Sequence, residues 1–150
     1  MLEVEVKYRN PDPAALAARL VELGASHLET RVDTDHYFNA PDRDLKSTDE
    51  AFRLRRIGPT SRFTYKGPRR DGATKTRPEI EVPLAEGDGV AEDAIRMLEC
   101  LGYRPVAVVT KNRAVYRLHR GGFEADVCLD EAPGIGTFAE VEIVASEDQF

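Results

Sequence analysis

The sequence has no tryptophan, only two cysteines and no long apolar run. Cys100 and Cys128 do not form a C-x-x-C pair, and the three histidines are scattered, so neither a disulfide framework nor a zinc site is indicated. No stretch approaches the roughly 18 apolar residues that a membrane-spanning helix requires. The first residues, Met-Leu-Glu-Val-Glu, lack the basic and apolar segments of a secretory signal, so we expect a cytoplasmic protein.

Charged side chains, by contrast, are abundant, at 32% of residues against about 25% in an average domain. The length of 150 residues is that of one ordinary domain, which can bury a core without disulfides or structural metals. Acidic residues outnumber basic residues by 27 to 21. This balance argues against a general nucleic-acid or anionic-membrane binder, because both require a basic surface. The positions of the charges are therefore more informative than their sum.

Sequence periodicity predicts two helices and about eight strands. Leucines at helical spacing predict helices over 11–24 and 90–101, which end at Gly24 and Gly102. Most of the remaining chain alternates between polar and apolar residues, which is typical of half-buried strands separated by glycine and proline turns. The predicted strands cover 2–9, 28–39, 51–57, 61–67, 75–84, 105–119, 122–130 and 137–145.

The predicted strands carry their charges on one face. In 2–8, for example, Glu3, Glu5 and Lys7 point to one side and the intervening apolar residues to the other. For any single strand the ordinary explanation is a solvent-exposed polar face. The polar faces are almost purely ionic, however, and four of the five lysines lie on them. The whole set favours a second arrangement, in which eight strands close into a barrel with the ionic faces inside.

Such an interior would hold cations and carboxylates together, with the apolar faces packed against the helices outside. Buried charges are tolerated only when they are paired or metal-bound. Arginine and lysine bind phosphate oxygens, and clustered carboxylates bind Mg²⁺ or Mn²⁺. The pattern therefore suits a polyanion that carries a divalent metal.

The E-x-E-x-K pattern of Glu3, Glu5 and Lys7 resembles the first strand of the CYTH superfamily, also called triphosphate tunnel metalloenzymes. Further similar segments follow in order along nearly the whole chain: Asp35–Asn39, Ala51–Arg55, Thr64–Pro68, Arg77–Glu81, Lys111–Arg113, Asp126–Asp130 and Gly136–Glu142. The segments look most like the class IV adenylyl cyclase branch, which is related to thiamine triphosphatases and inorganic tripolyphosphatases.

The resemblance implies an α+β fold, an eight-stranded antiparallel β-barrel or tunnel with helices packed outside, as a single domain over 1–150. Family members usually continue past the final strand with another helix. This sequence ends at Phe150, so its C-terminal end is short for the family. Either the family's C-terminal cover is absent here, or the chain is a shortened one.

The resemblance also assigns roles to the ionic residues. One or two Mg²⁺ or Mn²⁺ ions would be bound by Glu3, Glu5, Asp126, Glu140 and Glu142. A triphosphate would be bound by Lys7, Arg53, Arg55, Lys66, Lys111 and Arg113, with Lys75 and Arg77 as secondary candidates. Glu79 and Glu81 would support the site, by orienting the cations or by binding metal. Lys7 and Lys111 are both candidates for a catalytic base.

Two classes of function remain open at this point. The first is a metal-dependent enzyme, either a cyclase that converts ATP to cyclic AMP and pyrophosphate or a phosphatase acting on tripolyphosphate, thiamine triphosphate or a nucleoside triphosphate. The second is a non-catalytic polyphosphate- or nucleotide-binding barrel. In both, the expected partner is a small-molecule triphosphate rather than nucleic acid or membrane, and a homodimer is left open. A P-loop is excluded, because no G-x-x-x-x-G-K-[ST] sequence is present.

Overall fold

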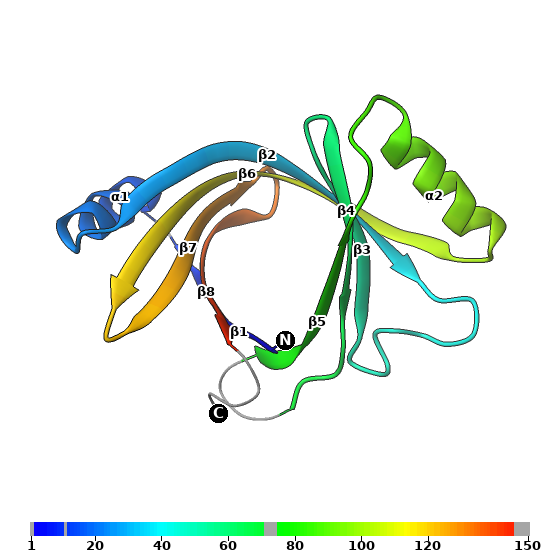
Figure 1. The fold of residues 1–150 in the computed structure, drawn as a ribbon, viewed down its shortest axis with the longest axis horizontal. Coiled ribbons are helices and arrows are strands. Elements are labelled where there is room, and N and C mark those ends of the chain that lie inside the picture. Colours follow the sequence, from blue (N-terminus) through cyan, green and yellow to red (C-terminus); the bar gives the residue numbers. More distant parts are fainter. Residues whose placement is uncertain (1, 11, 71–74, 146–150) are drawn as a thin grey trace. The chain divides into compact units, whose positions relative to one another are not determined.

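The computed structural model describes residues 2–10, 12–70 and 75–145, and gives only the backbone of residues 2, 3, 75, 144 and 145. Both predicted helices and all eight predicted strands are present, with bounds within two residues of the predicted ones. In chain order the elements are β1 (Leu2–Arg9), α1 (Pro13–Glu22), β2 (Ser26–Asn39), β3 (Ala51–Ile57), β4 (Thr60–Lys66), β5 (Lys75–Pro83), α2 (Val90–Cys100), β6 (Arg104–Arg120), β7 (Phe123–Ala132) and β8 (Gly136–Ala145) (Figure 1).

The strands form a closed barrel in the order β1-β5-β4-β3-β2-β6-β7-β8, which confirms the predicted eight-stranded architecture. The strand pairs whose register is defined are all antiparallel. The chain forms two compact units: the first contains 1–32, 70–76 and 111–150, and the second contains 33–69 and 77–110. Among the described residues, neither helix is long and apolar enough to cross a membrane.

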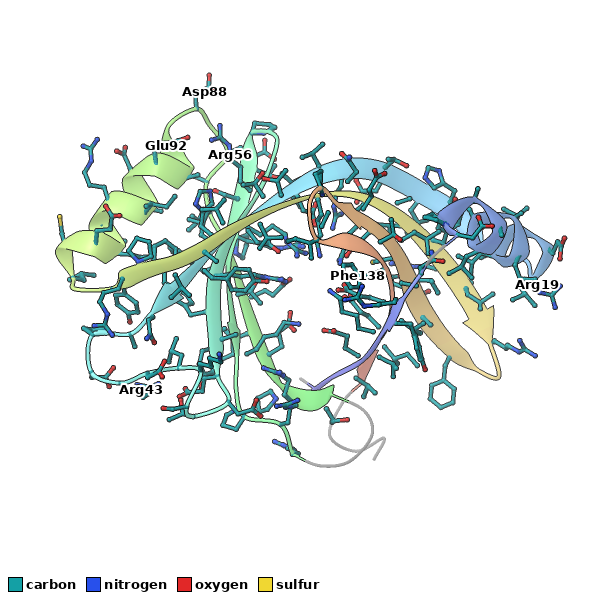
Figure 2. All side chains as sticks on the ribbon, turned by 180° about the vertical axis from the view of Figure 1, so that it is seen from behind. Arg19, Arg43, Arg56, Asp88, Glu92 and Phe138 are labelled. Carbon is teal, nitrogen blue, oxygen red and sulfur yellow. The ribbon has the colours of Figure 1, made fainter. Side chains whose placement is uncertain are left out.

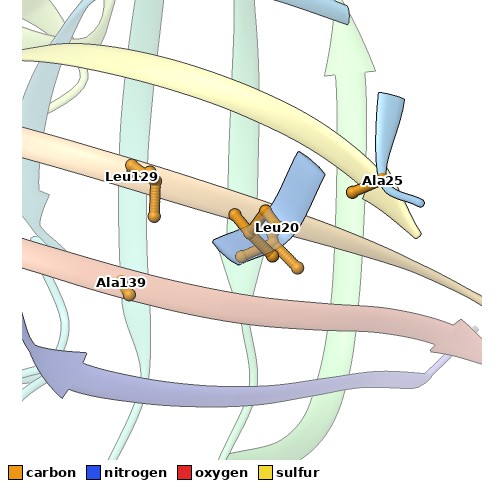
Figure 3. Close-up of a cluster of buried hydrophobic side chains, with 5 residues drawn as sticks. Leu20, Ala25, Leu129 and Ala139 are labelled. Carbon is orange, nitrogen blue, oxygen red and sulfur yellow. The ribbon is translucent and has the colours of Figure 1, made fainter. Parts of the chain in front are cut away.

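Helix α1 covers the apolar face of the strands in the first unit. Asp12 starts the helix as its N-cap, because its Oδ1 accepts a hydrogen bond from the Ala15 backbone N–H at 3.0 Å. Leu20 of this helix is only 5% exposed and belongs to a buried cluster with Leu129 of β7 and Ala139 of β8 (Figure 3). The apolar residues of the alternating strands therefore face a helix, as the sequence pattern predicts.

Helix α2 covers the apolar face of the second unit in the same way. Its Ala94 and Leu98 pack with Phe38 of β2 and Leu54 of β3 in a second buried cluster. In a closed barrel, the strand face that no helix covers is the interior face. The ionic residues, which alternate with these apolar ones, therefore line the inside.

Two features fix the ends of α2. At its start, Glu92 in the first turn forms an ion pair with Arg56 of β3, and Arg56 Nη1 lies 2.5 Å from Glu92 Oε1 (Figure 2). At its end, Gly102 adopts a φ of +89°, a left-handed conformation that glycine accepts readily and that commonly ends a helix. A Cβ at this position would lie 3.2 Å from the Cβ of Pro41, so a larger residue would meet both strain and crowding.

We predict that Leu54→Ala destabilises the protein by about 2–5 kcal/mol, because Leu54 has no exposed surface and its removal leaves a cavity. Leu101→Ala is the matched control, since Leu101 is 62% exposed, and it should change stability by about 0.5 kcal/mol or less. Urea unfolding of both variants measures the difference. Similar losses in the two variants would contradict the proposed core.

Candidate functional site

Strand register brings the ionic residues of the first unit together on one face. Residues directly opposite each other on antiparallel strands point to the same side of the sheet. The opposed pairs across β1, β8, β7 and β6 are Glu5 with Glu142, Lys7 with Glu140, Asp126 with Glu142, and Asp130 with Arg113. On β6, β7 and β8 these residues alternate with apolar residues that belong to the cluster under α1, and Glu5 and Lys7 join them by pairing with β8, so all of them share one ionic face.

Asp130 lies at the centre of a buried cluster on this face. Its side chain is 1% exposed and accepts hydrogen bonds from Lys111 Nζ at 2.9 Å and from Arg113 Nε and Nη2 at 2.7 and 2.6 Å. Glu140 accepts a hydrogen bond from Lys7 Nζ at 2.7 Å and another from Arg113 Nη2. The Nζ of Lys7 also lies 4.7 Å from the centroid of the Phe138 ring. Three cations thus share two carboxylates, and each cation is held in a fixed position.

The electrostatics of this cluster keep its charges despite burial. Burial raises the pKa of Glu140, but the positive charges of Arg113, Lys111 and Lys7 outweigh it and hold that pKa well below its usual range. Burial likewise opposes the charge of Arg113, but its hydrogen bonds to Asp130 and the charge of Glu140 raise its pKa above the ordinary value. Both groups are therefore ionised at neutral pH.

A buried aspartate holds two cations in the second unit as well. Asp35 of β2 is opposite Arg55 of β3, and its carboxylate accepts hydrogen bonds from Arg55 Nε at 2.7 Å and Nη2 at 2.8 Å. Asp35 also accepts a hydrogen bond from Arg53 Nη1 at 3.2 Å, and Asp33 Oδ2 lies 3.3 Å from Arg55 Nη1. Each unit therefore contains the same arrangement: an aspartate opposite an arginine, with a second cation two residues before that arginine.

The other predicted residues of the second unit lie on β4 and β5. Lys66 Nζ is 3.0 Å from Glu79 Oε2. Glu81 accepts a hydrogen bond from the Thr64 hydroxyl at 3.2 Å and lies 3.3 Å from Arg62 Nε. Arg77 is half-buried on the same face of β5. The side chains of Glu3 and Lys75, both predicted site residues, lie outside the described residues.

The predicted metal ligands occupy two different environments. Glu140 is buried between Lys7 and Arg113, whereas Glu5, Glu142 and Asp126 form a row across three adjacent strands. Cations also reach this row, since Arg113 Nη1 lies 3.8 Å from Glu142 Oε1 and Arg117 donates to Asp126. Among the described side chains, no three carboxylate, histidine or cysteine groups converge into a metal site. The row still provides the oxygen donors that Mg²⁺ and Mn²⁺ prefer, and Glu142 and Asp126 are 26% and 35% exposed. By donor chemistry these three residues fit a divalent ion.

Sequence reasoning did not identify Asp33, Asp35 and Asp130 as site residues. Asp35 and Asp130 lie within segments similar to the family, so a signal was present for these two. It could not single them out, because an aspartate becomes the partner of a particular arginine only through the register of two strands. Asp126, assigned to metal instead, accepts hydrogen bonds from Arg117 Nε and Nη2 at 2.8 and 3.0 Å.

Comparison with known proteins gives consistent matches over the whole chain. A model of the CYTH domain matches residues 1–150. Adenylate cyclase CyaB of Aeromonas hydrophila is 32% identical over 149 residues, which are 97% of this chain and 71% of that protein. A Methanocaldococcus jannaschii protein provisionally named adenylate cyclase is 33% identical over 142 residues, 95% of this chain and 77% of that protein. A solved structure from Pyrococcus horikoshii is 33% identical with a TM-score of 0.82, over 98% of this chain and 80% of that one.

We predict that Asp130→Asn destabilises the protein by about 3–5 kcal/mol, because it leaves Lys111 and Arg113 buried without their shared anion. Asp126→Asn on the same strand is the matched control and should lose about 1 kcal/mol or less, since Asp126 and Arg117 are each about one-third exposed. Urea unfolding without added metal compares the two. Equal losses would show that Asp130 is not the centre of the cluster.

The two cysteines should differ strongly in reactivity. Cys128 is 3% exposed on the ionic face opposite Glu140, and burial raises the pKa of its thiol to about 12. Cys100 is exposed on α2. Because the thiolate is the reactive species, iodoacetamide at pH 8 should label only Cys100 in the folded protein and both residues in urea. Peptide mass spectrometry distinguishes the sites, and rapid labelling of Cys128 in the folded state would contradict its burial.

Proposed function

This chain belongs to the CYTH domain family, and from that premise we propose that it is a metal-dependent adenylyl cyclase of the class IV type, which converts ATP to cyclic AMP and pyrophosphate. The observation that carries the proposal is the buried cluster in which Asp130 and Glu140 hold Lys7, Lys111 and Arg113. The names of the Aeromonas and Methanocaldococcus relatives support the choice of cyclase.

The cations of this cluster are suited to a triphosphate because they are positioned before any ligand binds. Phosphoryl transfer depends on positioning and on neutralising the charge that develops on phosphate oxygens. Hydrogen bonds to Asp130 and Glu140 hold these cations in place, so little ordering is needed on binding. On the second unit's ionic face, Arg53, Arg55 and Lys66 are held in the same way and are proposed to bind phosphate too.

The carboxylate row is the proposed site of one or two divalent ions, Mg²⁺ or Mn²⁺. Glu5, Glu142 and Asp126 would hold the metal, while Glu140 stays with the cations. A bound metal supplies Lewis-acid polarisation of the phosphate oxygens. These carboxylates keep their place because they project from three paired strands rather than from a loop.

Cyclisation requires the ribose 3′-hydroxyl to lose its proton as its oxygen attacks the α-phosphorus and pyrophosphate leaves. Lys7 and Lys111 are the proposed candidates for accepting that proton, and the lysine that acts as the base must first lose a proton to the solvent, so that it meets the hydroxyl as a neutral amine rather than as the cation that donates to Glu140 or Asp130. The Lys7 side chain is 34% exposed and contacts Glu140, whereas that of Lys111 is 9% exposed and donates to Asp130. Lys7 is therefore the more accessible of the two to a bound nucleotide.

A second candidate is hydrolysis of a triphosphate on the same faces, with water attacking the terminal phosphorus. It is favoured by the composition of the two ion clusters, whose members are all charged and so recognise phosphates regardless of the group attached to them. Tripolyphosphate and thiamine triphosphate are the corresponding substrates. A non-catalytic triphosphate-binding barrel would bind the same compounds without turnover.

One substrate panel separates these functions. The protein is incubated with ATP, tripolyphosphate or thiamine triphosphate, each with Mg²⁺ or Mn²⁺. Cyclic AMP and pyrophosphate from ATP support the cyclase, and orthophosphate from any of the three supports the phosphatase. A rise in Tm with triphosphate but no product supports binding alone.

We predict that Glu5→Gln and Glu142→Gln each reduce metal-dependent turnover by more than about 100-fold. Substituting a residue that only supports a metal ligand typically costs about 10- to 100-fold, so a larger loss indicates that the substituted residue binds the metal itself. Folding should be little affected, as judged by Tm. Glu22→Gln is the matched control, because Glu22 is exposed on α1 and forms its ion pair with Arg19, three residues away on the same helix. Unchanged rates in the Glu5 and Glu142 variants would rule out this metal assignment.

A further inference from the structure

The carboxylate row of the first unit ends at an arginine. Across β1, β8 and β7, the strand register places Glu5, Glu142 and Asp126 side by side. On β6, the residue opposite Asp126 is Arg117. Residues directly opposite each other point to the same side of a sheet, so Arg117 belongs to the same face as the three carboxylates. A side-chain cation therefore lies in line with the proposed metal ligands.

Arg117 contacts both oxygens of the Asp126 carboxylate. Its Nε and Nη2 donate hydrogen bonds to Asp126 Oδ1 and Oδ2 at 2.8 and 3.0 Å. This two-point contact is the strong form of an arginine–carboxylate pair. Mg²⁺ and Mn²⁺ bind through carboxylate oxygens as well. The guanidinium and a divalent ion therefore compete for the same two atoms, and their like charges repel each other.

The contact between Arg117 and Asp126 can be opened at small cost. Their side chains are 36% and 35% exposed, so water reaches the pair. Ion pairs in contact with water contribute little to stability, because solvent replaces much of the attraction. The side chains of Arg113 and Asp130, by contrast, are 3% and 1% exposed, and opening that pair would leave buried charges without partners. Arg117 can therefore leave its aspartate far more readily than Arg113 can.

Glu124 provides a second position for the guanidinium of Arg117. It lies two residues before Asp126 on β7, so it is on the same side of the strand and closer to the turn that joins β6 and β7. Arg117 Nη1 already lies 3.3 Å from Glu124 Oε1, and the Glu124 side chain is 52% exposed. A rotation of the arginine toward Glu124 would release the oxygens of Asp126 and keep the arginine charge paired.

We propose that Arg117 is an internal counter-ion of Asp126, and that a divalent ion displaces it toward Glu124 when the ion binds. The proposal rests on the proposed function, because it takes Glu5, Glu142 and Asp126 as the metal ligands. It adds that the affinity for the metal is set by a competing side chain as well as by the ligands. Removal of the arginine should therefore strengthen metal binding, whereas loss of a ligand or of a structural contact would weaken it.

The test is calorimetric titration of the protein with Mn²⁺ alone. Arg117→Gln should lower the Kd of Mn²⁺ by about two- to fivefold, which is the range expected when an ion pair exposed to water no longer has to be broken. Arg120→Gln is the matched control, because it removes the same charge from the same strand. Arg120 is exposed and, three residues beyond Arg117, points to the other side of β6, so its substitution should leave the Kd unchanged.

Glu124→Gln tests the second position of the arginine. In the wild-type protein this substitution should raise the Kd of Mn²⁺ by about two- to fivefold, because the displaced arginine no longer finds a partner. In the Arg117→Gln variant the same substitution should have a much smaller effect. Equal effects in the two backgrounds would show that Glu124 acts on the metal directly, and would overturn the proposed displacement.

The remaining outcomes separate this inference from the proposed function. If Arg117→Gln binds Mn²⁺ no more tightly than the wild type while Glu142→Gln binds it more weakly, Arg117 is no competitor and the metal ligands stand. If neither the wild type nor Arg117→Gln binds Mn²⁺, the metal-dependent function fails and the inference fails with it. Arg117→Lys keeps the charge without the two-point contact, so it should give an intermediate Kd, and it decides the question if Arg117→Gln does not fold.

Discussion

The pairing of a buried aspartate with the arginine directly across the strand ladder is the interaction on which the interior depends. Asp130 with Arg113 and Asp35 with Arg55 each form two-point contacts, and each aspartate also holds a second cation. Without these carboxylates the strands would present like charges to one another in a medium that screens them poorly. The pairing lets one sheet face bury several cations and still fold.

The same alternation that creates the ionic face also creates the core. On both units, apolar residues that alternate with the ionic ones pack under a helix, against Leu20 from α1 in one unit and Leu98 from α2 in the other. The stability of each unit and its binding face are therefore set by the same strand register. A one-residue slip would bury the charges against a helix and expose the apolar side chains, so fold and site cannot vary independently.

The sequence predicted the fold well because alternation, caps and turns are local signals. Asp12 and Gly24 bracket α1, and the predicted strand bounds lie close to the observed ones. The partners within the site were harder, because they depend on contacts between distant residues. The resemblance assigned Glu140 to the metal, which stays a prediction, and no local signal indicated that Glu140 pairs with Lys7, 133 residues away. The resemblance likewise assigned a role to Asp126 and none to Asp130, and alternation puts both on the ionic face, so only the burial of Asp130 in the structure separates them.

Because the Asp130 cluster is buried, its ion pairs should respond to salt differently from the ion pairs on the surface. Counter-ions reach surface pairs such as Arg19 with Glu22, whose side chains are more than 60% exposed, and weaken them at high ionic strength. They do not reach Arg113 and Asp130, whose side chains are 3% and 1% exposed. Concentrated salt should therefore remove much of the attraction between surface charges and leave the interior pairing largely intact, so the positions of the interior cations would not depend on the ionic composition of the surrounding solution.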